Sequence, residues 1–203
     1  MAPVEAQLRP QPMLLHFDVN KTVMLTDSMD QKSHEEGIRE AVSDLFWGVL
    51  RKKADGEFQW SWLGADTVGS KPPQLPDPVA KPDDKEVDFG TYADYCKKIV
   101  KDKKDRKAVL RNFTHATPET KEAMESMVKL AAANMELPGD IRDTDKAQLE
   151  QVGLKGSMYM MLPAMFNLVA DLVRRGQPFS VVFRSFGKDH EKIKAEWNAF
   201  CEM

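Results

Sequence analysis

Two short apolar runs, one near each end of the chain, constrain the fold of this sequence more than any other feature. Residues 13–17 are largely apolar and lead into the polar turn 18–22, and residues 179–183 form a second apolar, β-branched run. Runs of this length are typical of buried parallel strands when turns bound them. A helical pattern that begins at Pro163 leads directly into the second run. This order favours an α/β fold in which two parallel strands are joined by a right-handed crossover.

The interval between the two runs is far longer than the dozen or so residues that one crossover needs. The sequence therefore predicts a core with an insertion. We expect a flexible tail over residues 1–12, where three prolines occur without a periodic pattern. The α/β core is expected to comprise 13–32 and 157–203. A mainly helical insertion, or cap, is expected over 33–156, with a Pro-rich loop at about 69–90 that holds five prolines.

Several local signals divide the insertion into elements. Ser33 and a glutamate three residues later form a capping-box pattern, and helical spacing of apolar residues behind it predicts a helix to about Lys52. A turn signal then precedes residues 58–62, which alternate like a half-buried strand. Further helices are predicted from Thr91 and from Pro118. After the second apolar run, Ile193, Trp197 and Phe200 predict a last amphipathic helix.

Charge and cysteine content exclude several classes of protein. The 29 Lys+Arg and 32 Asp+Glu residues give a formal net charge of -3. This balance is typical neither of a protein that binds nucleic acid over its whole surface nor of an acidic disordered tail. Neither a run of roughly 18 apolar residues nor the apolar core of a signal peptide is found. Two cysteines are too few for a disulfide scaffold. We therefore expect a cytoplasmic protein with reduced thiols and no membrane association.

The carboxyl ends of the two predicted strands carry residues suited to phosphoryl chemistry. Asp18 lies at the end of the first strand and Ser185 just beyond the second, and ligands of open parallel sheets gather at this edge. A carboxylate placed there can attack phosphorus or bind a hard cation. Thr22 and the amides of residues 19–22 lie in the turn, where donors can converge on an anion. Equally, residues 18–20 are compatible with a plain polar turn, because Asp and Asn are common there.

Residues 16–23 resemble the first motif of the haloacid dehalogenase-like (HAD) superfamily, an apolar strand followed by Asp-x-Asp-x-Thr and an apolar residue. Residues 180–185 resemble its second motif, an apolar strand that ends in Ser or Thr. Many members insert a helical cap between these motifs. The resemblance implies a Rossmann-type core in which Asp18 is the nucleophile and a Mg²⁺ ligand. It also implies that the backbone carbonyl of Asn20 is a second Mg²⁺ ligand and that Ser185 binds the transferred phosphoryl group.

Two departures from the family pattern leave two functions open. Asn20 stands where the family's phosphatases have a catalytic acid/base; an amide can orient a leaving group but cannot transfer a proton, which typically costs about 10²–10⁴ in rate. The family's later Lys and acidic-pair motifs are not found after Ser185, so the chain is either a piece of a longer protein or a shortened relative. The first hypothesis is a Mg²⁺-dependent phosphatase-type hydrolase of a small phosphorylated substrate. The second is a catalytically inactive binding protein whose sheet a partner protein or a second copy completes.

A basic stretch at residues 97–111 holds eight Lys or Arg residues and two Asp, with Tyr92, Tyr95 and Phe113 nearby. We expect a solvated helix face here, since charge clusters on helices usually lie at the surface. RNA binding is an alternative, although nucleic acid is not the partner we expect. In a HAD-like cap, the same lysines could attract a phosphorylated substrate.

Overall fold

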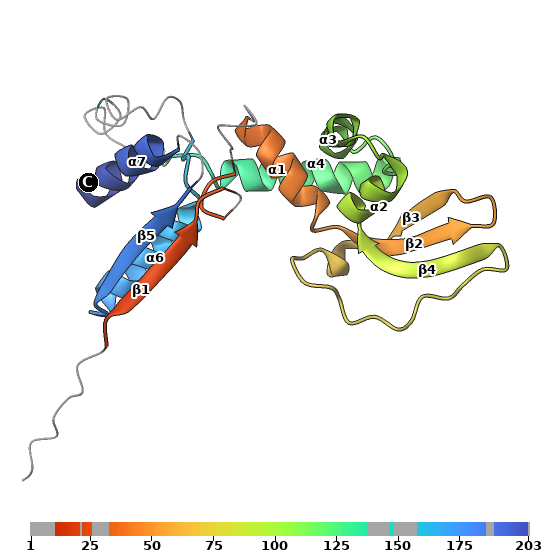
Figure 1. Ribbon diagram of the computed structural model, residues 1–203, viewed down its shortest axis with the longest axis horizontal. Helices are drawn as coiled ribbons and strands as arrows, with labels where there is room; N and C mark the ends of the chain where they lie inside the picture. Colours follow the sequence, from red (N-terminus) through yellow and green to blue (C-terminus); the bar gives the residue numbers. More distant parts are fainter. Residues whose placement is uncertain are drawn as a thin grey trace, which may run out of the picture. The chain divides into compact units, whose positions relative to one another are not determined.

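The computed structural model describes residues 11–20, 22–25, 33–137, 147, 158–185 and 189–202. The expected tail, apart from residues 11 and 12, and most of 138–157 lie outside the described residues. The chain divides into two compact units, one formed by residues 1–32 and 134–203 and the other by residues 33–133 (Figure 1). The first contains a small parallel sheet and the second an antiparallel sheet, so the fold is mixed α/β. The predicted insertion, 33–156, begins at the same residue as the second unit, but the second unit already ends at residue 133.

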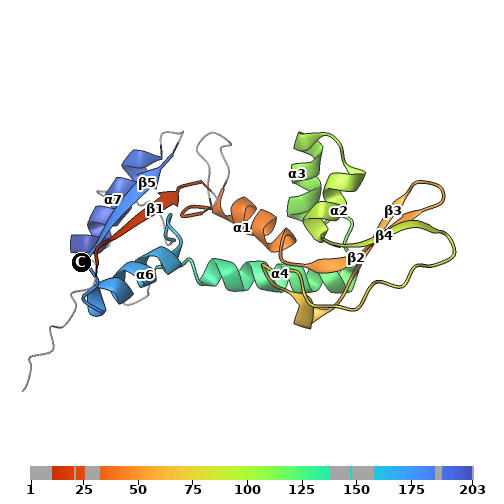
Figure 2. The same ribbon diagram turned by 60° about the horizontal axis from the view of Figure 1, so that its bottom comes forward.

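The sheet of the first unit consists of β1 (Met13–Asp18) and β5 (Phe179–Arg184). The two strands run parallel and in register from Met13↔Phe179 to Asp18↔Arg184, and Figure 2 shows them side by side. The predicted pairing of the two apolar runs as parallel strands is therefore confirmed. Their carboxyl ends lie together at one edge of the sheet.

Two helices cover one face of this sheet. Helix α6 (Pro163–Arg174) begins with the predicted proline at its first position. Gly176 follows its C-cap residue Arg175 and has a φ of 64°, the left-handed conformation that commonly ends a helix. Helix α7 (His190–Glu202) follows β5. The Phe166 and Phe200 rings of the two helices lie 4.6 Å apart between centroids. The buried core of this unit consists of Val19, Val23, Met24, Met161, Met165, Phe166, Val169 and Ile193.

The opposite face of the sheet is exposed. Because side chains alternate along a strand, every second residue of β1 and β5 points to this face, and all of those from Leu14 to Asp18 and from Ser180 to Arg184 are exposed. Leu14 is 62% exposed and Val182 37%. Parallel sheets are normally covered on both faces, whereas this two-stranded sheet leaves one face, which carries Leu14, Val182 and four polar residues, in contact with solvent.

The second unit is built around a three-stranded antiparallel sheet of order β3-β2-β4. Its strands are β2 (Trp47–Lys53), β3 (Phe58–Trp62) and β4 (Asp84–Thr91). The predicted turn joins β2 to β3, with Gly56 at φ 92°. Between β3 and β4 lie the short 3-10 helix η1 (Ala65–Thr67) and a proline-rich segment. Arg51 pairs with Asp84 at 3.1 Å and donates to the carbonyl of Val79, which ties this segment to the sheet.

Four helices complete the second unit: α1 (His34–Ser43), α2 (Tyr92–Ile99), α3 (Lys103–Asn112) and α4 (Pro118–Ala133). The predicted capping box at Ser33 is present, and a second one begins at Thr91. Arg39 of α1 makes a bidentate pair with Glu125 of α4, with both N–O distances 2.8 Å. The largest fully buried side chains of this unit are Ile38, Val42, Phe46, Tyr92, Phe113 and Met124.

Two expectations for this region are wrong. The predicted helix to Lys52 ends at Ser43, and residues 47–53 form the central strand β2 instead. The predicted loop to residue 90 ends earlier, because β4 begins at Asp84, two residues after the last proline of the segment. The second unit therefore combines its four helices with a three-stranded sheet, of which the sequence predicted only the strand at residues 58–62. In the described part of the chain, no helix has the length and apolar character that crossing a bilayer requires.

Candidate functional site

Asp18 and Ser185 lie at the same end of neighbouring strands, as the sequence predicted from their positions. Asp18 is the last residue of β1 and is in register with Arg184, the last residue of β5, which Ser185 follows directly. The amide of Val19 donates to the carbonyl of Arg184 at 2.9 Å, so the two strands are still joined at this point. The Asp18 side chain is exposed, whereas Ser185 is half-buried. A carboxylate and a hydroxyl group thus lie at the same edge of the sheet.

The turn after β1 is tightened around the carbonyl oxygen of Val19. This oxygen accepts hydrogen bonds from the amides of Val23 and Met24, both at 3.0 Å, and a longer one from Thr22 at 3.4 Å. The Val19 side chain is fully buried and anchors the turn in the core. The amides of Val19 and Thr22 are thus engaged within the protein. Among the described residues of this turn, Thr22 is exposed, and its hydroxyl can donate to a phosphoryl oxygen.

Asn20 places an acceptor oxygen inside the turn. Its Oδ1 atom is buried, and it has no hydrogen-bond partner among the residues that the structure describes. A buried polar atom without a partner in the protein indicates a bound water or ion. Oxygen donors of this kind suit Mg²⁺, which is commonly held by one or two carboxylates together with water and substrate phosphate. The Asp18 carboxylate and the Asn20 side-chain oxygen are thus two oxygen donors of the kind that a hard cation prefers.

Arg184 is a candidate site residue that sequence reasoning missed. Its in-register pairing with Asp18 places both side chains on the same, exposed face of the sheet. A guanidinium group binds phosphate in a bidentate manner and is always charged. The signal was present in the sequence, because Arg184 directly precedes Ser185 at the end of the second apolar run. Arg184 can be recognised as a neighbour of Asp18 only when the register of the two strands is known.

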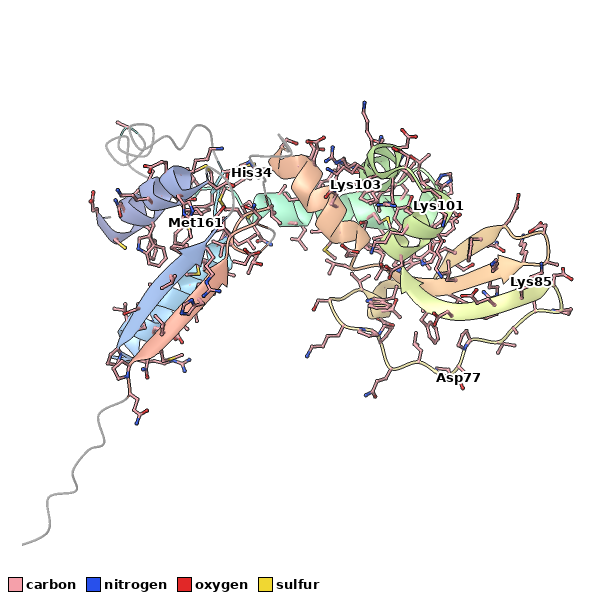
Figure 3. The ribbon with its side chains drawn as sticks, in the orientation of Figure 1. His34, Asp77, Lys85, Lys101, Lys103 and Met161 are labelled. Carbon is pink, nitrogen blue, oxygen red and sulfur yellow. The ribbon has the colours of Figure 1, made fainter. Side chains whose placement is uncertain are left out.

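A buried glutamate on α7 supports the base of the site. Glu196 is 2% exposed, and its carboxylate accepts hydrogen bonds from the amides of Met160 at 3.0 Å and Met161 at 2.7 Å. Burial raises the pKa of this carboxyl group to about 7, against the opposing effect of the two amides. Met161 forms an antiparallel bridge with Met24, the last residue of the turn around Val19. Glu196 therefore holds the segment against which the turn rests. Met161 is labelled in Figure 3.

The described residues contain no group of three or more His, Cys, Asp or Glu side chains that could hold a metal ion by themselves. Asp189, one of the few acidic residues after Ser185, is 1% exposed and precedes α7, where its carbonyl accepts from the amide of Ile193. Lys188 lies outside the described residues.

Comparison with protein-family models, with curated proteins and with solved structures gives no match.

Proposed function

We propose that this chain is a Mg²⁺-dependent, phosphatase-type hydrolase of the HAD-like kind, with Asp18 as its nucleophile. The observation that carries the proposal is the placement of Asp18 beside Arg184 and Ser185 at the carboxyl ends of two parallel strands. A carboxylate, a guanidinium group and a hydroxyl group at one edge can attack, neutralise and orient a phosphoryl group. The substrate is a small phosphate ester.

In this mechanism, a carboxylate oxygen of Asp18 attacks phosphorus. The new bond forms as the ester bond breaks, which leaves an aspartyl phosphate and an alkoxide or phenoxide leaving group. The Asn20 amide cannot donate a proton to the leaving oxygen, so water supplies it. A second water then attacks phosphorus, releases inorganic phosphate and restores the carboxylate. When bound, Mg²⁺ supplies neutralisation of phosphoryl charge. Arg184 and Ser185 hold the phosphoryl oxygens.

The first experiment measures Mg²⁺-dependent hydrolysis of an aryl phosphate by the wild type and by Asp18→Asn. We expect Asp18→Asn to abolish the activity, because the amide that replaces the carboxylate is not a nucleophile. Asp66→Asn, at an exposed aspartate of η1, is the matched control and should retain full activity. Equal activity in the wild type and Asp18→Asn would contradict the proposal.

A gain of activity provides a sharper test of the role of Asn20. If its amide occupies the place of a general acid, Asn20→Asp should increase the rate by up to about 10²–10⁴. The increase should be larger for alkyl than for aryl phosphates, because an alkoxide needs protonation more than a phenoxide does. A uniform change for both substrate classes would contradict the assigned position of Asn20 relative to the leaving group.

A catalytically inactive binding protein is the second candidate. It is favoured by Asn20 itself and by the absence, from the part of the chain that the structure describes, of a metal-binding group of three or more acidic, His or Cys side chains. In this case neither the wild type nor Asn20→Asp hydrolyses any phosphate ester. The exposed face of the β1–β5 sheet, which carries Leu14 and Val182, would then be the place to look for a protein partner or a second copy.

A further inference from the structure

A second candidate site lies in the unit formed by residues 33–133, apart from Asp18. An open pocket of about 570 Å³ is lined by the β2–β3 hairpin, the end of α2 and the segments that follow α2 and α3. This volume is within the range of small-molecule sites. Lys101, which lines the pocket, is labelled in Figure 3 near Lys103, the first residue of α3.

The lining of this pocket carries an excess of positive charge. The ammonium groups of Lys52 and Lys98 lie 5.4 and 5.5 Å from the centroid of the Phe58 ring. Lys98 has an exposed ion pair with Glu86 at 3.8 Å, and such pairs neutralise little charge. Among the described residues, no ion pair is formed by Lys52 or Lys101. Like charges that converge on one ring favour an anionic ligand between them.

One wall of the pocket is an aromatic ring held in place by its neighbours. Tyr95 is half-buried and stacks on Trp60 with 6.4 Å between ring centroids and an interplanar angle of 15°. His115 meets the Tyr95 ring edge-on at 6.3 Å. Burial raises the pKa of the Tyr95 phenol, so it stays neutral at physiological pH. A ring that is fixed before binding loses little conformational entropy when a flat ligand stacks on it.

We propose that this pocket binds a nucleoside phosphate, whose base stacks on Tyr95 and whose phosphate lies among Lys52, Lys98 and Lys101. Stacking on an aromatic side chain with lysines along the backbone is the general mode by which proteins bind single nucleotides of a strand. Glu57, the one acidic residue of the lining, would accept a hydrogen bond from a ribose hydroxyl or a base amino group. A free nucleotide and the end of a single-stranded nucleic acid present the same chemistry.

Binding to the full chain can be measured by fluorescence anisotropy with a labelled adenosine monophosphate, followed by competition with unlabelled adenosine monophosphate, inorganic phosphate, adenosine and a ten-nucleotide RNA. We expect unlabelled nucleotide to compete more strongly than phosphate or adenosine alone, because both parts of the pocket are used. Stronger competition by RNA, with a steeper salt dependence, would identify a strand as the natural source, and competition equal to that of the mononucleotide would identify a free nucleotide.

Two matched pairs of substitutions locate the site. Lys98→Gln with Lys101→Gln should weaken binding about tenfold or more, a loss comparable to one base-stacking contact. Lys103→Gln with Lys104→Gln removes the same charge from exposed positions of α3 outside the pocket lining, and it should change binding less than about twofold.

Substitutions at Tyr95 test the stacking itself. Tyr95→Phe keeps the ring and should retain binding, whereas Tyr95→Leu should weaken it. Circular dichroism melting shows whether the leucine variant still folds, and the lysine pairs provide the test if it does not. Three outcomes would overturn the proposal: absence of saturable nucleotide binding, an equal loss of affinity in both double-lysine variants, or competition by phosphate as strong as that by nucleotide. Asp18→Asn should bind nucleotide like the wild type, so failure here and failure of the hydrolase proposal are distinguishable.

Discussion

The buried carboxyl group of Glu196 should make the stability of the first unit depend on pH. Its pKa of about 7 in the folded protein exceeds the usual 4.5 of an unfolded chain. The folded state therefore keeps its proton to higher pH than the unfolded state does. The contribution of this group to the free energy of unfolding is thus fully present below about pH 4.5 and declines as the pH rises to about 7. At 1.36 kcal/mol per pKa unit, the decline is about 3 kcal/mol.

Glu196→Gln removes this titration. The glutamine oxygen can accept from one of the amides of Met160 and Met161, but its NH₂ group faces the other, which costs about 1–3 kcal/mol at all pH values. The variant should therefore be less stable than the wild type at pH 5 and lose less stability between pH 5 and pH 8. Glu191→Gln, at an exposed position of the same helix, is the matched control and should follow the wild type.

The measurement needs a signal from the first unit alone. Trp197 lies on α7, whereas the other three tryptophans lie in the second unit. ¹⁹F NMR of 5-fluorotryptophan-labelled protein during urea unfolding separates these signals, with Trp197→Phe to assign the resonance. All other ionisable groups are the same in the wild type and in the variant, so their contributions cancel in the comparison. If both lose the same stability between pH 5 and pH 8, the assignment of the titration to Glu196 is refuted.

Two further predictions concern the second unit and the thiols. A Cβ atom added at Gly48 would lie 2.3 Å from Nε1 of Trp60, which donates to the carbonyl of Gly90. Gly48→Ala should therefore lower the free energy of unfolding of the second unit by about 1–3 kcal/mol, as measured by urea unfolding. An unchanged unfolding midpoint would contradict this packing. Cys96 is buried and its pKa is raised to about 11 by burial, whereas Cys201 is exposed. With Ellman's reagent at pH 8, one thiol per native chain should react rapidly, and two thiols should do so in urea. Rapid reaction of two thiols in the native state would contradict the burial of Cys96.

The parallel pair of the first unit could be predicted because its signals are local and agree with each other. The apolar runs of β1 and β5, the proline that begins α6 and Gly176 at its end each specify the same arrangement. The carboxyl ends of the strands, and hence the neighbourhood of Asp18 and Ser185, followed from that. What the sequence did not predict was the exposed face of this sheet, because it depends on which elements pack against it.

The error at α1 has an identifiable cause. The apolar spacing that begins at Ile38 continues through Leu50, so helical periodicity extends beyond the true end of the helix. Trp47 and Val49 favour strands and Gly48 disfavours a helix. The pairing of β2 with both β3 and β4 selects the strand over the helix. This pairing joins residues that are distant in the sequence, so local sequence patterns do not reveal it. The site residue Arg184 was missed for a similar reason, because its relation to Asp18 depends on strand register.

The pairing of β1 with β5 also sets an order of events during synthesis. The second unit is a continuous segment, residues 33–133, whereas β1 must wait for β5, more than 150 residues later, before its hydrogen bonds can form. At about 5–20 residues per second, this delay is on the order of ten to thirty seconds. During that time β1 is an unpaired apolar strand on the nascent chain. We expect chaperones that bind extended apolar segments to hold it until Arg184 has left the ribosome.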